Sequence, residues 1–179
     1  IGAGKSRAEA ESVRVFNVRG LRLGILGFTS TRPEQAWAKP SRPGVAYSDF
    51  DRLPSAIGAA KKKCDVLVVS FHGGTELAQD PNAIQRGFAR VAVDAGADLV
   101  IGHHPHVLQP VELYKDKPIL YSIGNFFFVS PSTGTNLTVI AEARLTPQGV
   151  ARIEFTPVDV NWGRLKRASP SEAQSIFQA

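Results

Sequence analysis

Apolar and polar positions in the first third of the chain follow strand and helix periods, interrupted by one long irregular stretch. Residues 13–18 and 21–28 are apolar runs separated by an Arg-Gly pair, which predicts two paired strands joined by a turn. Residues 29–47 contain three prolines and no sustained period, which predicts a long surface loop. A short helix is predicted next, from near residue 48 or 54 to Lys63, where basic residues suit the negative end of the helix dipole.

The middle of the chain has the pattern of a strand, a helix and a second strand. Residues 65–70 contain a continuous, largely β-branched run, which is typical of a strand buried on both faces of a parallel sheet. Asp80 and Pro81 suit the N-cap and first position of a helix that Gly96 ends. Its apolar residues recur at helical spacing: Ile84, Phe88, Val91 and Ala95. Residues 99–101 form the next strand, so this region predicts a βαβ unit with two parallel strands.

The last third of the chain is predicted to contain strands followed by one helix. The strands cover residues 119–122, 137–145 and 150–160, with a turn at residues 147–149 between the last two. Ser169 and Pro170 open a short amphipathic helix. Strands mixed with helices around a βαβ unit indicate the α/β class. The length of 179 residues and the 43% hydrophobic content favour a single domain over residues 1–179.

Composition restricts the setting and the partners of the chain. It contains no methionine and no apolar run long enough to cross a membrane, so we expect a portion of a longer protein whose membrane contacts are made elsewhere. The net charge of +5 favours anionic partners in general. Because the basic residues lack regularly interleaved aromatics, nucleic acid is not expected among them. The single cysteine, Cys64, excludes an internal disulfide and is interpreted as a packing residue.

All four histidines follow the two strands of the predicted βαβ unit. His72 comes after the first strand, and His103, His104 and His106 come after the second. Ligands of open α/β sheets bind at the carboxyl ends of the strands, and neighbouring strands lie roughly 5 Å apart, so these loops can converge on one ion. Imidazole is the commonest transition-metal ligand, and His-Pro-His gives two rings on one stiff loop. The glycines beside them, at residues 73, 74 and 102, are expected to leave room for a bound ion or ligand.

Two other chemistries are less well supported by the pattern. A Ser-His-Asp arrangement would use Ser70 or Ser122, but neither lies in a Gly-x-Ser-x-Gly elbow. Residues 2–6, Gly-Ala-Gly-Lys-Ser, resemble the end of a phosphate-binding loop, but the first glycine and the preceding strand are missing. A histidine cluster that binds metal therefore remains the leading hypothesis. His103 is as easily a core or loop residue, or one that orients a ligand, as a ligand itself.

Three segments together resemble the bacterial capsule-synthesis (CapA, poly-γ-glutamate synthesis) protein family. They are residues 65–73, residues 94–110 with their Gly-His-His-Pro-His core, and residues 121–126, Tyr-Ser-Ile-Gly-Asn-Phe. Residues 2–10 and 20–29 also resemble family segments, so the resemblance extends over essentially the whole chain. It implies the C-terminal portion of a calcineurin-like metallophosphoesterase fold, an α/β sandwich flanked by helices.

The resemblance also implies a set of site residues. His72, His104 and His106 would be metal ligands in a site for two divalent ions, manganese, iron or zinc, although the choice between His103 and His104 stays open. His103, Asn125 and Glu76 would line the substrate pocket or orient the ligands. The remaining family ligands, an aspartate pair and an asparagine-histidine segment, have no counterpart here, so these residues alone are not expected to turn over substrate. Gly73 stands where family members often have an aromatic residue, which alters the expected pocket shape.

Two functions are consistent with this resemblance. The first is metal-dependent hydrolysis of a phosphoester within capsule or poly-γ-glutamate synthesis. The alternative is a non-catalytic module that assembles, exports or anchors an anionic cell-surface polymer, which the net charge of +5 suits. Either implies other capsule-synthesis components as partners and an extracytoplasmic location at the membrane or cell surface.

Overall fold

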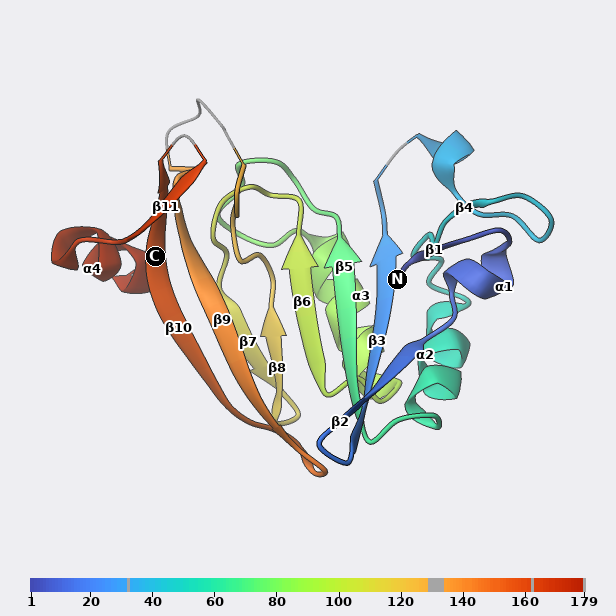
Figure 1. Cartoon of the computed structure of the whole chain (residues 1–179). Coiled ribbons are helices and arrows are strands. Elements are labelled where there is room, and N and C mark those ends of the chain that lie inside the picture. Colours follow the sequence, from blue (N-terminus) through green and yellow to red (C-terminus); the bar gives the residue numbers. More distant parts are fainter. Residues whose placement is uncertain (32, 129–133, 162, 179) are drawn as a thin grey trace.

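A computed structural model describes residues 1–31, 33–128, 134–161 and 163–178 of the chain (Figure 1). Two sheets contain most of its strands. The strands are β1 (Ala3–Gly4), β2 (Arg14–Val18), β3 (Leu21–Thr29), β4 (Gly44–Val45), β5 (Val66–His72), β6 (Leu99–His103), β7 (Val111–Tyr114), β8 (Lys117–Leu120), β9 (Leu137–Thr146), β10 (Gly149–Asn161) and β11 (Arg164–Arg167). The helices are α1 (Arg7–Ala10), α2 (Leu53–Lys61), α3 (Ala83–Asp94) and α4 (Pro170–Gln178), with a 3₁₀ turn at Glu34–Ala36.

The larger sheet has six strands in the order β2-β3-β5-β6-β8-β7. Strands β3, β5, β6 and β8 are parallel to one another, and β2 and β7 are antiparallel edge strands. The predicted strand pair and the parallel strands of the βαβ unit are therefore confirmed. A second, antiparallel sheet has the strand order β11-β10-β9 and lies beside the β7–β8 end of the first (Figure 1). Its strand β10 also contacts β5 of the larger sheet.

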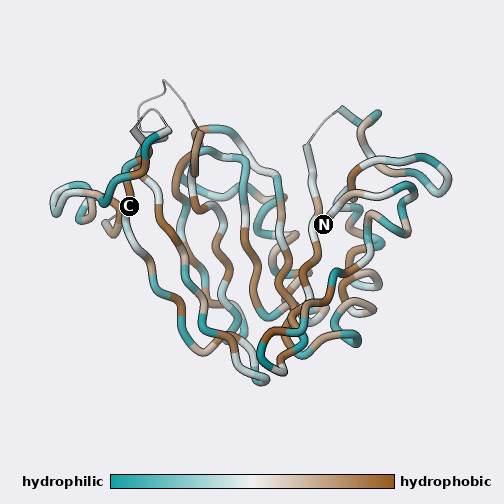
Figure 2. Tube along the Cα trace, viewed as in Figure 1, coloured by the Kyte–Doolittle hydropathy of each residue, from teal (hydrophilic) through white to brown (hydrophobic). Residues whose placement is uncertain are grey.

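The hydrophobic core lies between the six-stranded sheet and helices α2 and α3, which cover one of its faces (Figure 1). Phe88 of α3 is fully buried, stacks on Phe71 of β5 with ring centroids 4.0 Å apart, and meets Phe28 of β3 edge-on at 5.9 Å. Figure 2 shows the hydrophobic residues running along the strands in the middle of the sheet. This packing fixes β3, β5 and β6 relative to one another, and with them the edge where their carboxyl ends meet.

Helix α3 begins two residues later than the sequence predicted. Asn82, rather than Asp80, is its N-cap, and Ala83 rather than Pro81 is its first residue. The Asn82 side chain accepts from the Gln85 backbone N–H at 3.0 Å, while the Gln85 side chain accepts from the Asn82 N–H at 3.0 Å. This capping box satisfies two backbone donors at once, whereas a cap at Asp80 would have Ala83, which has no side-chain acceptor, at the third helical position.

Other elements differ from prediction where the local pattern is weak. The irregular region 29–47 contains the 3₁₀ turn and β4, which pairs with β1; residue 32 of that loop lies outside the described residues. Strand β7 forms a hairpin with β8 through Lys115 and Asp116, which both have positive φ, 49° and 58°. Strand β11 is a basic segment that pairs with β10. Both of these strands were missed, because one turn lacks glycine and the other strand lacks apolar alternation.

A buried carboxylate directly before β6 ties that strand to three other elements, α2, β5 and β8, at the amino-terminal edge of the sheet. Asp98, which is 4% exposed, accepts from Lys61 Nζ at 2.5 Å, from Lys117 Nζ at 2.8 Å and from the Leu67 N–H at 2.9 Å. Burial alone would raise the pKa of the Asp98 carboxyl, but the hydrogen bonds from Lys117 and Lys61 outweigh it and hold that pKa below its ordinary value. This cluster lies at the edge opposite to the histidines, so it supports the sheet without contacting them.

Candidate metal centre

The carboxyl ends of β3, β5 and β6 form one edge of the larger sheet, and the histidines gather there. In register, Thr29 of β3 pairs with His72, and His72 pairs with His103, so that both histidines are the last residues of their strands. The Gly73 N–H donates to the His103 carbonyl at 3.0 Å, which extends the pairing one step past the strand end. The loops that leave β5 and β6 therefore start side by side, as the arrowheads in Figure 1 show.

The loop after β6 turns back sharply at two histidines. His104 and His106 have positive φ values of 106° and 63°, a backbone region that is uncommon for residues with a Cβ. This conformation brings the His104 ring to the other two candidate ligands, with centroids 5.0 Å from His72 and 6.1 Å from His106. Such strained backbone is found preferentially at functional sites, where the surrounding structure holds it.

Glu76, on the loop after β5, joins the two histidines of the β6 loop. Within the described residues, one ligand atom from each of Glu76, His104 and His106 lies within 4.8 Å of the others. The two loops are linked beside this group, since the Leu77 N–H donates to the Pro105 carbonyl at 2.9 Å. The sequence suggested only a pocket-lining role for Glu76, but the geometry brings its carboxylate within reach of an ion shared with both imidazoles.

Asn125 orients the ring of His106. Its Oδ1 lies 2.7 Å from His106 Nδ1, and its Nδ2 donates to the Thr135 carbonyl at 3.1 Å. Because the amide donates with Nδ2, its oxygen accepts from His106 Nδ1, so in the neutral ring it is Nε2 that carries the lone pair. Asn125 is 5% exposed, and Phe128 stacks on the other side of the ring with centroids 5.0 Å apart. The arrangement is that of a metal-binding histidine with a fixed tautomer.

His72 and His103 lie outside the converging group but share its environment. Burial lowers the pKa of the His72 imidazole, and the nearby His104, His103 and His106 lower it further. Burial also lowers the pKa of His103. Both shifts favour the neutral form of the ring, the form that can accept a metal ion or a hydrogen bond. Of the two adjacent histidines at the end of β6, His104 is the one that converges with Glu76 and His106.

The glycines beside the histidines lie in close contact with other parts of the protein. A Cβ on Gly73 would lie 2.1 Å from Ser30 Oγ, and one on Gly102 would lie 2.0 Å from the Tyr121 carbonyl oxygen. A Cβ on Gly74 would lie 2.6 Å from the side chain of Gln85. Close packing within the protein therefore accounts for these glycines, and whether they also admit an ion or ligand stays a prediction from the sequence.

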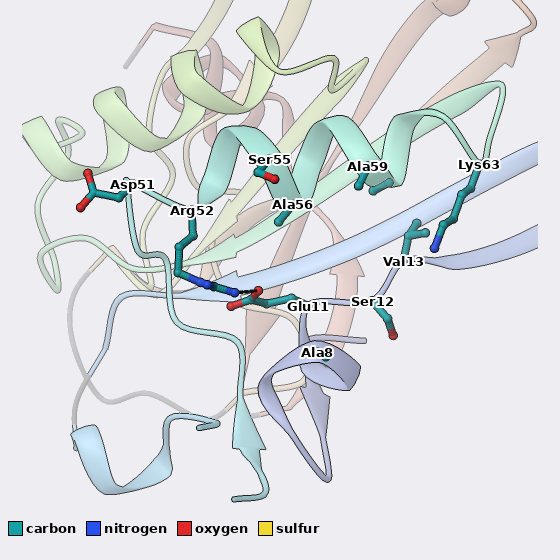
Figure 3. A pocket seen from close by; sticks show the side chains of 11 residues that line it. Ala8, Glu11, Ser12, Val13, Asp51, Arg52, Ser55, Ala56, Ala59 and Lys63 are labelled. Carbon is teal, nitrogen blue, oxygen red and sulfur yellow. Dashed lines mark hydrogen bonds and ion pairs between the residues drawn. The ribbon is translucent and has the colours of Figure 1, made fainter. Parts of the chain in front are cut away.

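Two open cavities differ in their relation to this centre. One, of about 420 Å³, adjoins His72 and is lined also by Thr29, Thr31 and Ser70, so it offers space for a substrate next to the histidines. The other, of about 430 Å³, lies under α2 and is crossed by the Arg52–Glu11 ion pair at 2.8 Å (Figure 3). No histidine lines the second cavity, and nothing in the sequence singled it out.

Comparisons with known proteins agree with the resemblance found in the sequence. The family described as "Bacterial capsule synthesis protein PGA_cap" matches residues 1–130. The "PGA biosynthesis protein CapA" of Bacillus subtilis (strain 168) is 40% identical over 162 residues, covering 90% of this chain and 43% of that protein. The "Capsule biosynthesis protein CapA" of Bacillus anthracis is 36% identical over 170 residues, covering 93% of this chain and 41% of that protein. The chain thus spans about two fifths of the length of these relatives.

A solved structure shares the fold. The sulfate thiohydrolase SoxB of Thermus thermophilus superimposes with a TM-score of 0.54 at 18% sequence identity, over 93% of this chain and 28% of that chain. At this identity the similarity concerns the fold alone. It confirms the predicted class, a mixed α/β arrangement with sheets flanked by helices.

Proposed function

Because the chain belongs to the bacterial capsule synthesis protein family PGA_cap, we propose that it supplies part of a divalent-metal site with which the whole protein hydrolyses a phosphoester in capsule or poly-γ-glutamate synthesis. The observation that carries the proposal is the convergence of Glu76, His104 and His106 at the carboxyl edge of the sheet. Imidazole nitrogens with a carboxylate oxygen suit manganese, iron or zinc. Three protein ligands leave coordination positions for water and substrate, as in catalytic rather than structural sites.

The residues around this group support metal binding by their orientation and their surroundings. Asn125 contacts Nδ1 of His106 and leaves its Nε2 without a contact to Asn125, and burial together with the neighbouring histidines lowers the pKa of His72. A bound divalent ion would supply a Lewis acid for the phosphoryl oxygens and a nucleophilic water near neutral pH. A second ion of the site would need ligands beyond these residues, and His72, whose ring centroid lies 5.0 Å from that of His104, would be one additional imidazole. The cavity beside His72 would receive the ester.

The setting of this activity belongs to the same proposal. The substrate is a phosphoester or an anionic polymer, which the net charge of +5 attracts, and the partners are other capsule-synthesis components rather than nucleic acid. The expected location is extracytoplasmic, at the membrane or cell surface. Within the described residues, no helix has the length and apolar character needed to cross a membrane.

The test uses the full-length protein purified without chelators. Wild type should retain manganese, iron or zinc by elemental analysis and cleave a generic aryl phosphodiester, and His104→Ala should lose both. Gln148→Ala, on the exposed β9–β10 turn, is the matched control and should behave as wild type. A metal-free protein that binds polyglutamate in a salt-sensitive way would refute the hydrolase and favour a non-catalytic polymer-binding module.

A further inference from the structure

We infer that two buried glutamines, Gln85 and Gln109, are positioning residues that hold the Glu76 loop against the His104–His106 loop. The effect on metal affinity rests on the proposed function, whereas the effect on the loops does not. Gln85 is 1% exposed and Gln109 is 7% exposed, although neither touches the candidate ligands. Burying two primary amides is unfavourable unless their donors and acceptors are satisfied. The partners of their hydrogen bonds therefore indicate which segments the two glutamines hold in place.

The hydrogen bonds fix the orientation of both amides. Gln85 Oε1 accepts from the Asn82 N–H at 3.0 Å, and its Nε2 donates to Gln109 Oε1 at 2.7 Å and to the Tyr121 carbonyl at 3.4 Å. Gln109 Nε2 in turn donates to the Ala78 carbonyl at 2.9 Å. Flipping either amide would place donor against donor and acceptor against acceptor, so only one orientation satisfies both side chains. The resulting chain of hydrogen bonds, here called the relay, runs from α3 through Gln109 to the Glu76 loop.

The relay anchors the Glu76 loop on the side where it meets the histidines. Gln109, three residues after His106, donates to the Ala78 carbonyl, and the Leu77 N–H donates to the carbonyl of Pro105 between the two histidines. On the other side of Glu76, the Thr75 hydroxyl accepts from Asn82 Nδ2 at 3.1 Å. Glu76 is itself exposed, so these neighbours, rather than packing of its own side chain, determine where its carboxylate lies.

Gly74 shows that the loop passes directly over the Gln85 amide. Its φ is +131°, and a Cβ there would lie 2.6 Å from the Gln85 side chain. A capping-box glutamine in an exposed first turn would not need such an approach. Gln85 thus combines two roles, closing the start of α3 and supporting the loop that carries Glu76.

The decisive variant is Gln109→Glu in the full-length protein. It keeps the size of the side chain and the acceptor for Gln85, but it places a carboxylate oxygen against the Ala78 carbonyl and removes that bond. We expect Co²⁺ affinity to fall by roughly 10- to 100-fold and the visible Co²⁺ spectrum to change, as for other residues that orient metal ligands. Asp98→Asn destabilises the opposite edge of the sheet, so it is the control for a general loss of stability and should keep the wild-type affinity and spectrum.

Coupling to Glu76 separates positioning from a general structural role. In a Glu76→Ala background, Gln109→Glu should cause no further loss of Co²⁺ affinity, because the ligand through which it acts is gone. Without metal, the Leu77 amide proton should exchange faster in Gln109→Glu than in wild type or Asp98→Asn. The inference would be overturned if Gln109→Glu had the same Leu77 exchange rate and the same Co²⁺ affinity as the wild type. Failure of the wild type itself to bind Co²⁺ would overturn the proposed function, while the exchange result would still decide whether the relay holds the loop.

Discussion

Replacing Asp98 with asparagine removes the charge that joins α2, β5, β6 and β8 while preserving the shape of the side chain. Hydrogen bonds to charged groups contribute about 1.5–3 kcal/mol each, and Asp98 makes two with lysines. The lysine side chains are 33% and 30% exposed, so water replaces part of what is lost, and asparagine retains one acceptor. We therefore expect Asp98→Asn to lower the free energy of unfolding by about 2–3 kcal/mol, below the 3–5 kcal/mol typical of breaking a fully buried pair.

Urea unfolding at neutral pH measures this difference, and its pH dependence tests the cause. The pKa of Asp98 is lower in the folded protein than its ordinary value of 3.8, so its contribution is complete above that pH and disappears as the pH falls through the folded pKa. The gap between wild type and Asp98→Asn should therefore narrow only below about pH 4. A loss under about 1 kcal/mol at neutral pH, or a gap that stays constant into acid, would refute the assignment of the cluster as a stabilising charge network.

Three further predictions follow from single contacts. Gly102→Ala should lower the free energy of unfolding, measured by urea denaturation, by about 3 kcal/mol, because its Cβ would lie 2.0 Å from the Tyr121 carbonyl oxygen. A variant as stable as wild type would show that β6 and the end of β8 lie further apart. Burial and the hydrogen bond to Glu112 raise the pKa of Tyr121 to about 12, so Glu112→Gln should lower that pKa in an ultraviolet titration, and an unchanged value would exclude the contact. His104→Gly should raise the stability of the metal-free protein by roughly 1 kcal/mol, because it relieves a φ of 106°, while abolishing metal binding; a loss of stability would contradict the strain.

Periodicity predicted the parts of the fold that local pattern determines. The apolar run of β5, the helical spacing in α3 and the next run in β6 were sufficient to place a βαβ unit and to put the histidines at one edge of the sheet. The β7–β8 hairpin was missed because Lys115 and Asp116 adopt positive φ without the glycine or asparagine that usually marks such a turn. Asn82 displaced Asp80 as the cap because the choice depends on Gln85, three residues ahead.

The centre itself could be predicted only in part. The sequence indicated the histidines, because their spacing after two parallel strands is a local feature. It did not indicate that Glu76 approaches His104 and His106, because this depends on positive φ at both histidines and at Leu77, which the local sequence does not mark. The Gln85–Gln109 relay was also missed, since a glutamine in the first turn of a helix ordinarily signals only a cap.

The most direct test of the metal centre is anomalous diffraction from crystals of the full-length protein soaked in manganese or zinc. The account predicts an anomalous peak within about 2.5 Å of one imidazole nitrogen each from His104 and His106 and of a Glu76 carboxylate oxygen. A metal bound elsewhere while these three side chains point apart would contradict it.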